Sequence, residues 1–109
     1  MNKNALIADF VGLPKQYADP DRLCPMYENP ETGEYCFPEY LEFDYSWDWL
    51  MSAVLEIVPP KGFPLHLIEY QSKVVNALQR ANFEATHAAV LEFIEEYNKT
   101  NNNENKGKN

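Results

Sequence analysis

The chain has 109 residues, 45% hydrophobic and 24% charged, so it has room for one compact domain of ordinary globular composition. Its 9 basic and 17 acidic residues give a net charge of −8, which excludes a general binder of the nucleic-acid backbone, because such proteins hold phosphates with Lys and Arg. The four glycines lie too far apart for a Walker loop or a dinucleotide-binding fingerprint.

Targeting signals are not expected. The first fifteen residues are too polar for a signal peptide, because Asp9 interrupts their apolar stretch. The longest uncharged apolar run elsewhere, 50–55, is far shorter than the roughly 20 residues of a membrane-spanning helix. The sequence therefore predicts a cytoplasmic protein.

The first half of the chain is predicted to hold a helix and a hairpin. Apolar residues at helical spacing predict a helix over 3–13, ended by Gly12 and Pro14. Residues 15–25 are expected to be irregular. Residues 26–28 and 35–37 form the arms of a hairpin around a turn with Pro30 and Gly33, and 40–43 is expected to extend its second arm.

Cys24 and Cys36 could form a disulfide, and the hairpin bears on that question. If the turn is centred on Glu31 and Thr32, Cys36 faces Tyr27, and Cys24 lies three residues further along. That offset is too long for directly opposed partners unless a bulge changes it, so free thiols are expected. Neither cysteine has the CxxC spacing of a redox or zinc site.

The second half is predicted to be mainly helical. A helix over 46–57 carries an apolar stripe and ends before Pro59-Pro60, whereas 63–70 is expected to be a strand and 71–80 suits a short helix better than a strand. A helix over 82–98, with Asn82 as its N-cap, precedes a polar segment, 99–109, expected to be a disordered tail. The stripe of the 46–57 helix consists of Trp47, Leu50, Met51, Val54 and Leu55.

Together these elements predict the α+β class: a single domain over 1–98 in which two or three amphipathic helices pack on a small antiparallel sheet. The negative charge is concentrated in the middle of this domain. Between Leu23 and Pro60 there is no Lys or Arg, eight acids carry the entire net charge, and eight of the fifteen aromatic residues lie in the same window. The six candidate partner-binding residues, called the acidic surface below, are Glu28, Glu31, Glu34, Glu39, Glu42 and Asp44.

The acidic surface has two interpretations. It can be a solvated face that keeps the protein soluble, with acids and aromatics alternating because one side of a sheet is wet. Alternatively, it can be a docking surface for a basic partner, since like charge speeds encounter with an opposite patch and aromatics anchor interfaces. Carboxylates at regular intervals can also imitate the phosphates of a nucleic acid and occupy a groove meant for one.

Catalysis is not expected from this sequence. Carboxylate pairs such as Glu39 with Glu42, or Asp44 with Asp48, would suit a small hydrolase, but with 17 acids some pair always lies close. His66 and His87 have no His or Cys at helical spacing to complete a metal site. The acidic neighbours of both cysteines are expected to raise the thiol pKa and so to oppose nucleophilic chemistry. No catalytic residue, cofactor or metal is therefore predicted.

Three segments, 5–12 (ALIADFVG), 45–51 (YSWDWLM) and 90–98 (VLEFIEEYN), form a recognisable pattern. They resemble a group of small uncharacterised proteins of Bacteroidetes genomes, phages and mobile elements, and the likeness spans roughly residues 4–98. Some related phage proteins look like a sheet sandwiched by helices. The chain departs from the group at Ser52-Ala53, where a proline is usual, and at 71–80, where many relatives continue the sheet.

The resemblance implies a context and no activity. A small acidic protein of a phage or mobile element often acts by binding a protein of its bacterial host. The leading hypothesis is a non-enzymatic binding protein whose acidic surface docks on a host nucleic-acid-handling protein, most specifically an anti-CRISPR or other counter-defence inhibitor. The alternatives are a structural or assembly protein of a phage or host, and the small hydrolase.

Overall fold

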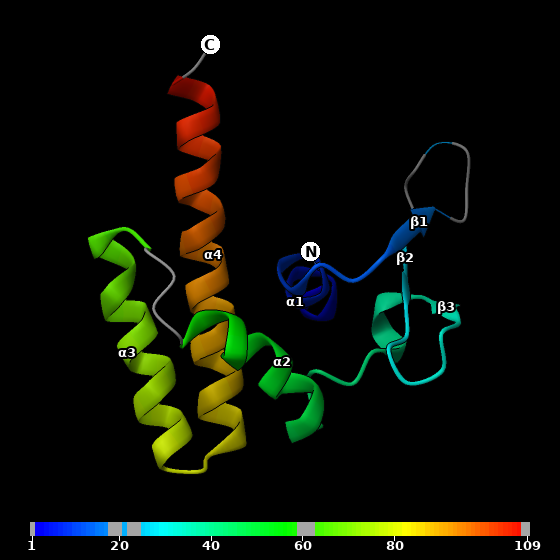
Figure 1. The fold of residues 1–109 in the computed structure, drawn as a ribbon, viewed down its shortest axis with the longest axis horizontal. Coiled ribbons are helices and arrows are strands. Elements are labelled where there is room, and N and C mark those ends of the chain that lie inside the picture. The colour runs from blue at the N-terminus through cyan, green and yellow to red at the C-terminus, as the bar shows by residue number, and fades with distance from the viewer. Residues whose placement is uncertain (1, 18–20, 22–24, 59–62, 108–109) are drawn as a thin grey trace. The chain divides into compact units, whose positions relative to one another are not determined.

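The computed structural model describes residues 2–17, 21, 25–58 and 63–107, with side chains described up to Thr100. The fold is of the α+β class, with a three-stranded antiparallel sheet and four α-helices in the described part of the chain, so the predicted class is confirmed (Figure 1). The chain forms two compact units, Met1–Ser52 and Ala53–Asn109, and the boundary falls within helix α2, Trp47–Ile57.

The first unit begins with helix α1, Lys3–Val11, which confirms the predicted N-terminal helix. Asn2 caps it, because its Oδ1 accepts hydrogen bonds from the amides of Asn4 at 2.8 Å and Ala5 at 3.3 Å. Gly12 ends the helix with a φ of 79°, a left-handed conformation that glycine adopts without steric cost.

The sheet has the order β1-β2-β3, with β1 at Lys15–Tyr17, β2 at Pro25–Glu28 and β3 at Tyr35–Cys36. Tyr27 pairs with Cys36, as the centred turn predicts. The prediction of an irregular 15–25 was wrong at β1, whose three residues are all exposed, so that no apolar alternation marks them as a strand. Cys36 has a free thiol, whereas Cys24 lies outside the described residues.

After β3 the chain does not extend the hairpin. A short 3₁₀ helix, η1 at Pro38–Tyr40, replaces the predicted strand extension over 40–43, because Pro38 lacks the amide hydrogen that a strand ladder requires. Asn4 fastens this segment to α1, since its Nδ2 donates to the carbonyl oxygens of Pro38 at 3.0 Å and Leu41 at 2.9 Å. The fully or almost fully buried side chains of this unit include Ile7, Ala8, Tyr27, Leu41, Phe43 and Leu50.

Helix α2 forms as predicted, and Leu50 and Val54 of the predicted stripe are buried, but the buried face extends to other residues than the rest of that stripe. Trp47 and Leu55 of the predicted stripe are 36% and 60% exposed. The helix is apolar on more than one side, and a second set with the same helical spacing is the one that packs. The buried residues of α2 are Trp49, Leu50, Ala53, Val54 and Ile57.

The second unit contains the end of α2 and an antiparallel pair of helices, α3 at Leu65–Gln79 and α4 at Phe83–Gly107 (Figure 1). The predicted strand over 63–70 was wrong, because α3 begins at Leu65, directly after Pro64 at its N-cap position. The side chain of Gln71 ties α3 to α2 by donating to the carbonyl oxygens of Ile57 at 2.7 Å and Val58 at 3.0 Å.

Helix α4 begins as predicted and ends later. Asn82 is its N-cap, with Oδ1 accepting from the amide of Ala85 at 3.0 Å. The helix continues to Gly107, through most of the segment predicted as a tail, so its predicted end at Asn98 was wrong. Its buried face holds Thr86, Ala89, Val90, Leu91, Phe93 and Ile94.

Candidate functional site

The charges of three carboxylates of the acidic surface act on one exposed aromatic side chain. Tyr45 is 68% exposed, and its pKa is raised, first by desolvation and then by the charges of Glu42, Asp44 and Glu31. We call these four residues the Tyr45 cluster. Glu31 lies in the hairpin turn, and the other three members lie in the segment before α2, eleven or more positions later in the sequence. The fold brings these two segments together.

The segment before α2 holds its carboxylates outward because its apolar residues point inward. Leu41 is extended, with φ −77° and ψ 150°, and along extended backbone successive side chains point in opposite directions. Leu41 and Phe43 are accordingly buried, while Asp44 is exposed and Glu42 is half-buried. The chain then turns, with the amide of Ser46 donating to the carbonyl oxygen of Glu42 at 2.9 Å.

Trp49 places Glu31 in the cluster. Its indole Nε1 donates a hydrogen bond to Glu31 Oε1 at 2.8 Å, and its ring packs edge-on against Phe43 with centroids 5.3 Å apart. The hairpin turn that carries Glu31 is itself ordered by Asn29, whose Oδ1 accepts from the amide of Glu31 at 2.8 Å. The buried core of this unit is thus directly connected to one carboxylate of the exposed cluster.

The other three residues of the acidic surface lie elsewhere in the same unit. Glu39, on η1, lines a hollow of about 250 Å³ together with Asp44 of the Tyr45 cluster and Lys3 of α1. Glu28 lies on β2 opposite Tyr35, and Glu34 lies in the hairpin turn. No side-chain hydrogen bond or ion pair found among the described residues joins Glu28 or Glu34 to the Tyr45 cluster. The structure therefore gathers three of the six predicted residues, places Glu39 beside them, and does not join the remaining two to the group.

Ion pairs do not neutralise the acidic surface within the described part of the chain. The ion pairs there are Lys15 with Asp9 at 3.4 Å, Lys73 with Glu92 at 2.7 Å, and Lys99 with Glu96 at 3.1 Å. None of them involves a residue of the acidic surface. Arg22 and Lys61, which flank the acidic segment in sequence, lie outside the described residues. Among the described cations, none is paired with a carboxylate of the Tyr45 cluster.

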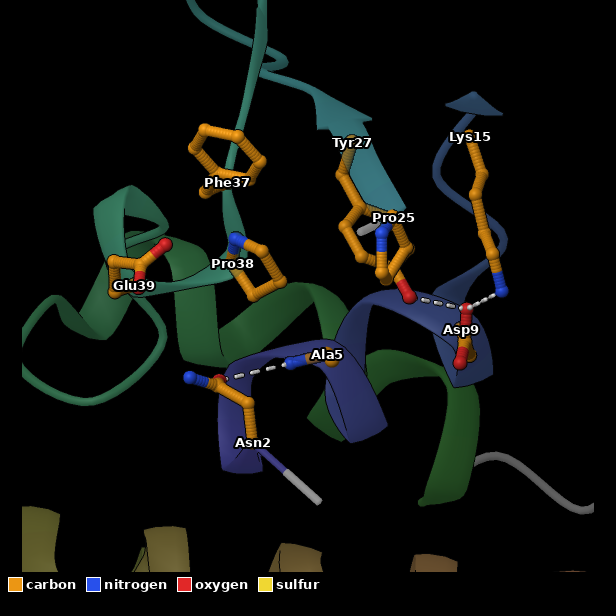
Figure 2. A pocket seen from close by; sticks show the side chains of 9 residues that line it. All are labelled: Asn2, Ala5, Asp9, Lys15, Pro25, Tyr27, Phe37, Pro38 and Glu39. Carbon is orange, nitrogen blue, oxygen red and sulfur yellow. Dashed lines mark hydrogen bonds and ion pairs between the residues drawn. The ribbon is translucent and has the colours of Figure 1, made fainter. Parts of the chain in front are cut away.

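Sequence reasoning missed a second group, formed by Asp9, Lys15 and Tyr27. The Tyr27 hydroxyl donates to Asp9 Oδ1 at 2.7 Å, and Lys15 Nζ lies 3.4 Å from the same oxygen (Figure 2). Burial, the hydrogen bond to Asp9 and the Asp9 charge all raise the pKa of Tyr27. These contacts join α1 to β1 and β2. The one sequence signal for them is a charged residue, Asp9, inside the otherwise apolar run 5–11.

The cysteine and histidine side chains that the structure describes are Cys36, His66 and His87. Burial raises the pKa of the Cys36 thiol, so the predicted direction is correct while the cause is desolvation and not acidic neighbours. The His66 Nε2 lies 2.6 Å from Thr100 Oγ1, and His87 stacks on Phe83. Among the described residues, no group of three His, Cys, Asp or Glu side chains could hold a metal ion.

The comparisons with known proteins add no name to this arrangement. No protein-family model, no curated protein and no solved structure matches the chain. Within the described residues, no helix is long and apolar enough to cross a membrane.

Proposed function

We propose that this is a non-enzymatic binding protein whose acidic surface docks on a basic surface of another protein. The observation that carries the proposal is the Tyr45 cluster, in which the charges of three carboxylates act on one exposed tyrosine and none of the three forms an ion pair with a described cation. A concentrated negative patch speeds encounter with a positive one, and tyrosine supplies contact area at little cost in conformational entropy.

The partner class follows from charge. Basic surfaces large enough to meet several carboxylates occur above all on proteins that hold phosphate backbones. We therefore propose a nucleic-acid-handling protein of the host as the partner, with the carboxylates standing where phosphates would lie. In its most specific form, which rests on the resemblance to phage and mobile-element proteins, the function is counter-defence, with an anti-CRISPR inhibitor as the example.

A second candidate, assembly with copies of itself or with structural proteins, is favoured by one observation. The second unit exposes large apolar side chains, with Leu55 60%, Leu65 85% and Ile68 45% exposed. Exposed apolar residues that gather on one face are typical of interaction surfaces. In that case the acidic surface serves solubility, and the binding activity belongs to the second unit.

The experiment is affinity capture from host lysate with a pair of matched variants. E42K/D44K reverses two charges of the Tyr45 cluster, and E69K/E95K makes the same change in net charge at exposed positions of α3 and α4. The proposal expects a partner that is captured at low salt, is released as ionic strength rises, and is lost with E42K/D44K but not with E69K/E95K.

Two results would contradict this proposal. The first is equal capture by both variants. The second is a partner that high salt leaves in place and that substitution of Leu65 and Ile68 by Ser removes, which would establish the assembly alternative. For the specific form, addition of the nucleic acid bound by the captured protein should displace the chain, and failure to compete would refute phosphate mimicry.

A further inference from the structure

Residues of α1, the sheet and η1 line an open hollow of about 360 Å³ in the first unit (Figure 2). Its size is at the low end for ligand pockets, which suits one long side chain better than a cofactor. Its walls are mainly apolar, and charged groups lie at two ends. The residues that carry the argument are Asp9, Lys15, Pro25, Tyr27, Phe37, Pro38 and Glu39.

One end of the hollow is already occupied by a cation of the chain. Lys15 Nζ lies 3.4 Å from the Asp9 carboxylate and 5.7 Å from the centroid of the Tyr27 ring. An aromatic ring together with a carboxylate is a combination that attracts a cation through both its π face and its charge. The position of Lys15 therefore shows that the walls of this hollow hold a cationic side chain.

The opposite end of the hollow is also lined by an aromatic ring and a carboxylate, those of Phe37 and Glu39. Figure 2 shows Glu39 on the far side of Pro38 from Asp9, with Phe37 above Pro38. Phe37 is 38% exposed, and Glu39 forms no ion pair with the described cations. Lys3 lines the neighbouring hollow with Glu39 but is not within ion-pair distance of it.

We propose that the Glu39 end of this hollow binds an arginine side chain of the partner. The inference rests on the proposed function and names the anchoring residue at its acidic surface. The aliphatic stem of an arginine would lie along Pro38 and Pro25, its planar guanidinium would stack on Phe37, and its paired N–H groups would meet the Glu39 carboxylate. Lysine fits less well, because its ammonium is a strongly hydrated point charge that neither stacks nor binds a carboxylate through two parallel bonds.

The test uses small-molecule probes on the full chain and needs no partner. N-acetyl-arginine amide is titrated into the ¹⁵N-labelled protein, and backbone amide shifts are compared with those caused by N-acetyl-citrulline amide and N-acetyl-lysine amide. We expect saturable shifts at Phe37 and Glu39 with the arginine probe. We expect at least about tenfold weaker binding of citrulline, which keeps the shape and loses the charge, and weaker binding of lysine.

Two variants locate the site. E39Q is expected to weaken the arginine probe about tenfold, and E69Q, which changes an exposed carboxylate of α3 outside the hollow and outside the acidic surface, is expected to leave it unchanged. The inference is overturned if citrulline or lysine binds as well as arginine, if E39Q and E69Q behave alike, or if the shifts lie away from Phe37 and Glu39.

Failure here is distinguishable from failure of the proposed function. Loss of the arginine preference, with partner capture still abolished by E42K/D44K, would remove the arginine pocket and leave the acidic docking surface standing. If the arginine preference is intact but E42K/D44K captures the partner as well as the wild type does, the arginine site is supported. The proposed docking of a partner on the Tyr45 cluster is then refuted.

Discussion

Replacement of the buried Asn4 by alanine should destabilise the protein more than an asparagine-to-alanine change at an exposed position. Asn4 is 5% exposed, and its Nδ2 makes the two hydrogen bonds that fasten α1 to Pro38 and Leu41. Its Oδ1 is buried without a hydrogen-bond partner in the described structure. The amide orientation is nevertheless fixed, because a flipped amide would place its oxygen against two carbonyl oxygens.

The magnitude follows from those bonds. Each buried hydrogen bond contributes about 1 kcal/mol net, so N4A should lower the free energy of unfolding by about 2 kcal/mol. With a urea m-value of about 1.5 kcal/mol/M, the midpoint should fall by roughly 1.3 M. N4D should cost more than N4A at neutral pH, because it sets a buried carboxylate against the two carbonyl oxygens.

The assay is urea unfolding followed in parallel by tryptophan fluorescence and far-UV circular dichroism. Both tryptophans, Trp47 and Trp49, lie in the first unit, so fluorescence reports on that unit, whereas circular dichroism reports on the helices of both. Asn76, exposed on α3, supplies the matched control N76A, which is expected to change stability by less than about 0.5 kcal/mol. If N4A unfolds at the same urea concentration as N76A, the two hydrogen bonds do not hold η1 against α1.

Three further predictions concern single contacts. W49F keeps an aromatic ring against Phe43 but loses the N–H donated to Glu31, and chemical unfolding should show a loss of about 1 kcal/mol; a larger loss in W47F would contradict the assignment. The pKa of Tyr27 is raised in the folded state, so the contribution of Tyr27 to the free energy of unfolding should be fully present below pH about 10. Above that pH the tyrosine of the unfolded chain ionises, and the free energy of unfolding should fall by up to about 1.4 kcal/mol per pH unit. In Y27F that fall should be smaller, and an identical pH profile would refute it. Because burial raises the pKa of Cys36, its alkylation by iodoacetamide at pH 8 should be slower than that of an unfolded-state cysteine, and equal rates in native and denatured protein would contradict this.

Local chemistry was sufficient to predict parts of the fold. The hairpin register follows from where Pro30 and Gly33 allow the chain to turn, and the pairing of Tyr27 with Cys36 depends on nothing further away. The N-cap at Asn82 is equally local. Such features are set by the few residues that form them, so a sequence pattern is enough.

Other parts of the fold depend on which of two possible apolar patterns is buried by tertiary contacts. Phe63, Leu65 and Leu67 alternate as in a strand, but α3 forms because Leu67, Val74 and Ala77 recur at helical spacing over a longer stretch and are buried. On α2 two apolar stripes share the same helix, and only tertiary contacts choose between them. The Tyr45 cluster could not be derived from sequence either, because the approach of Glu31 to Tyr45 depends on the indole of Trp49, in another element.

The segment 38–44 contributes both to the acidic surface and to the core of the first unit. The Asn4 side chain donates hydrogen bonds to the carbonyl oxygens of Pro38 and Leu41. Pro38 lines the 360 Å³ hollow beside Glu39, and Leu41 directly precedes the turn that begins at Glu42. Partner binding should therefore respond to Asn4 although its side chain is buried. N4A should weaken capture of the partner under conditions where the protein is still folded, and it should do so without the change in salt dependence that E42K/D44K causes, because no charge is removed. Equal capture by folded N4A and the wild type would show that the carboxylates find their partner without the geometry that η1 imposes.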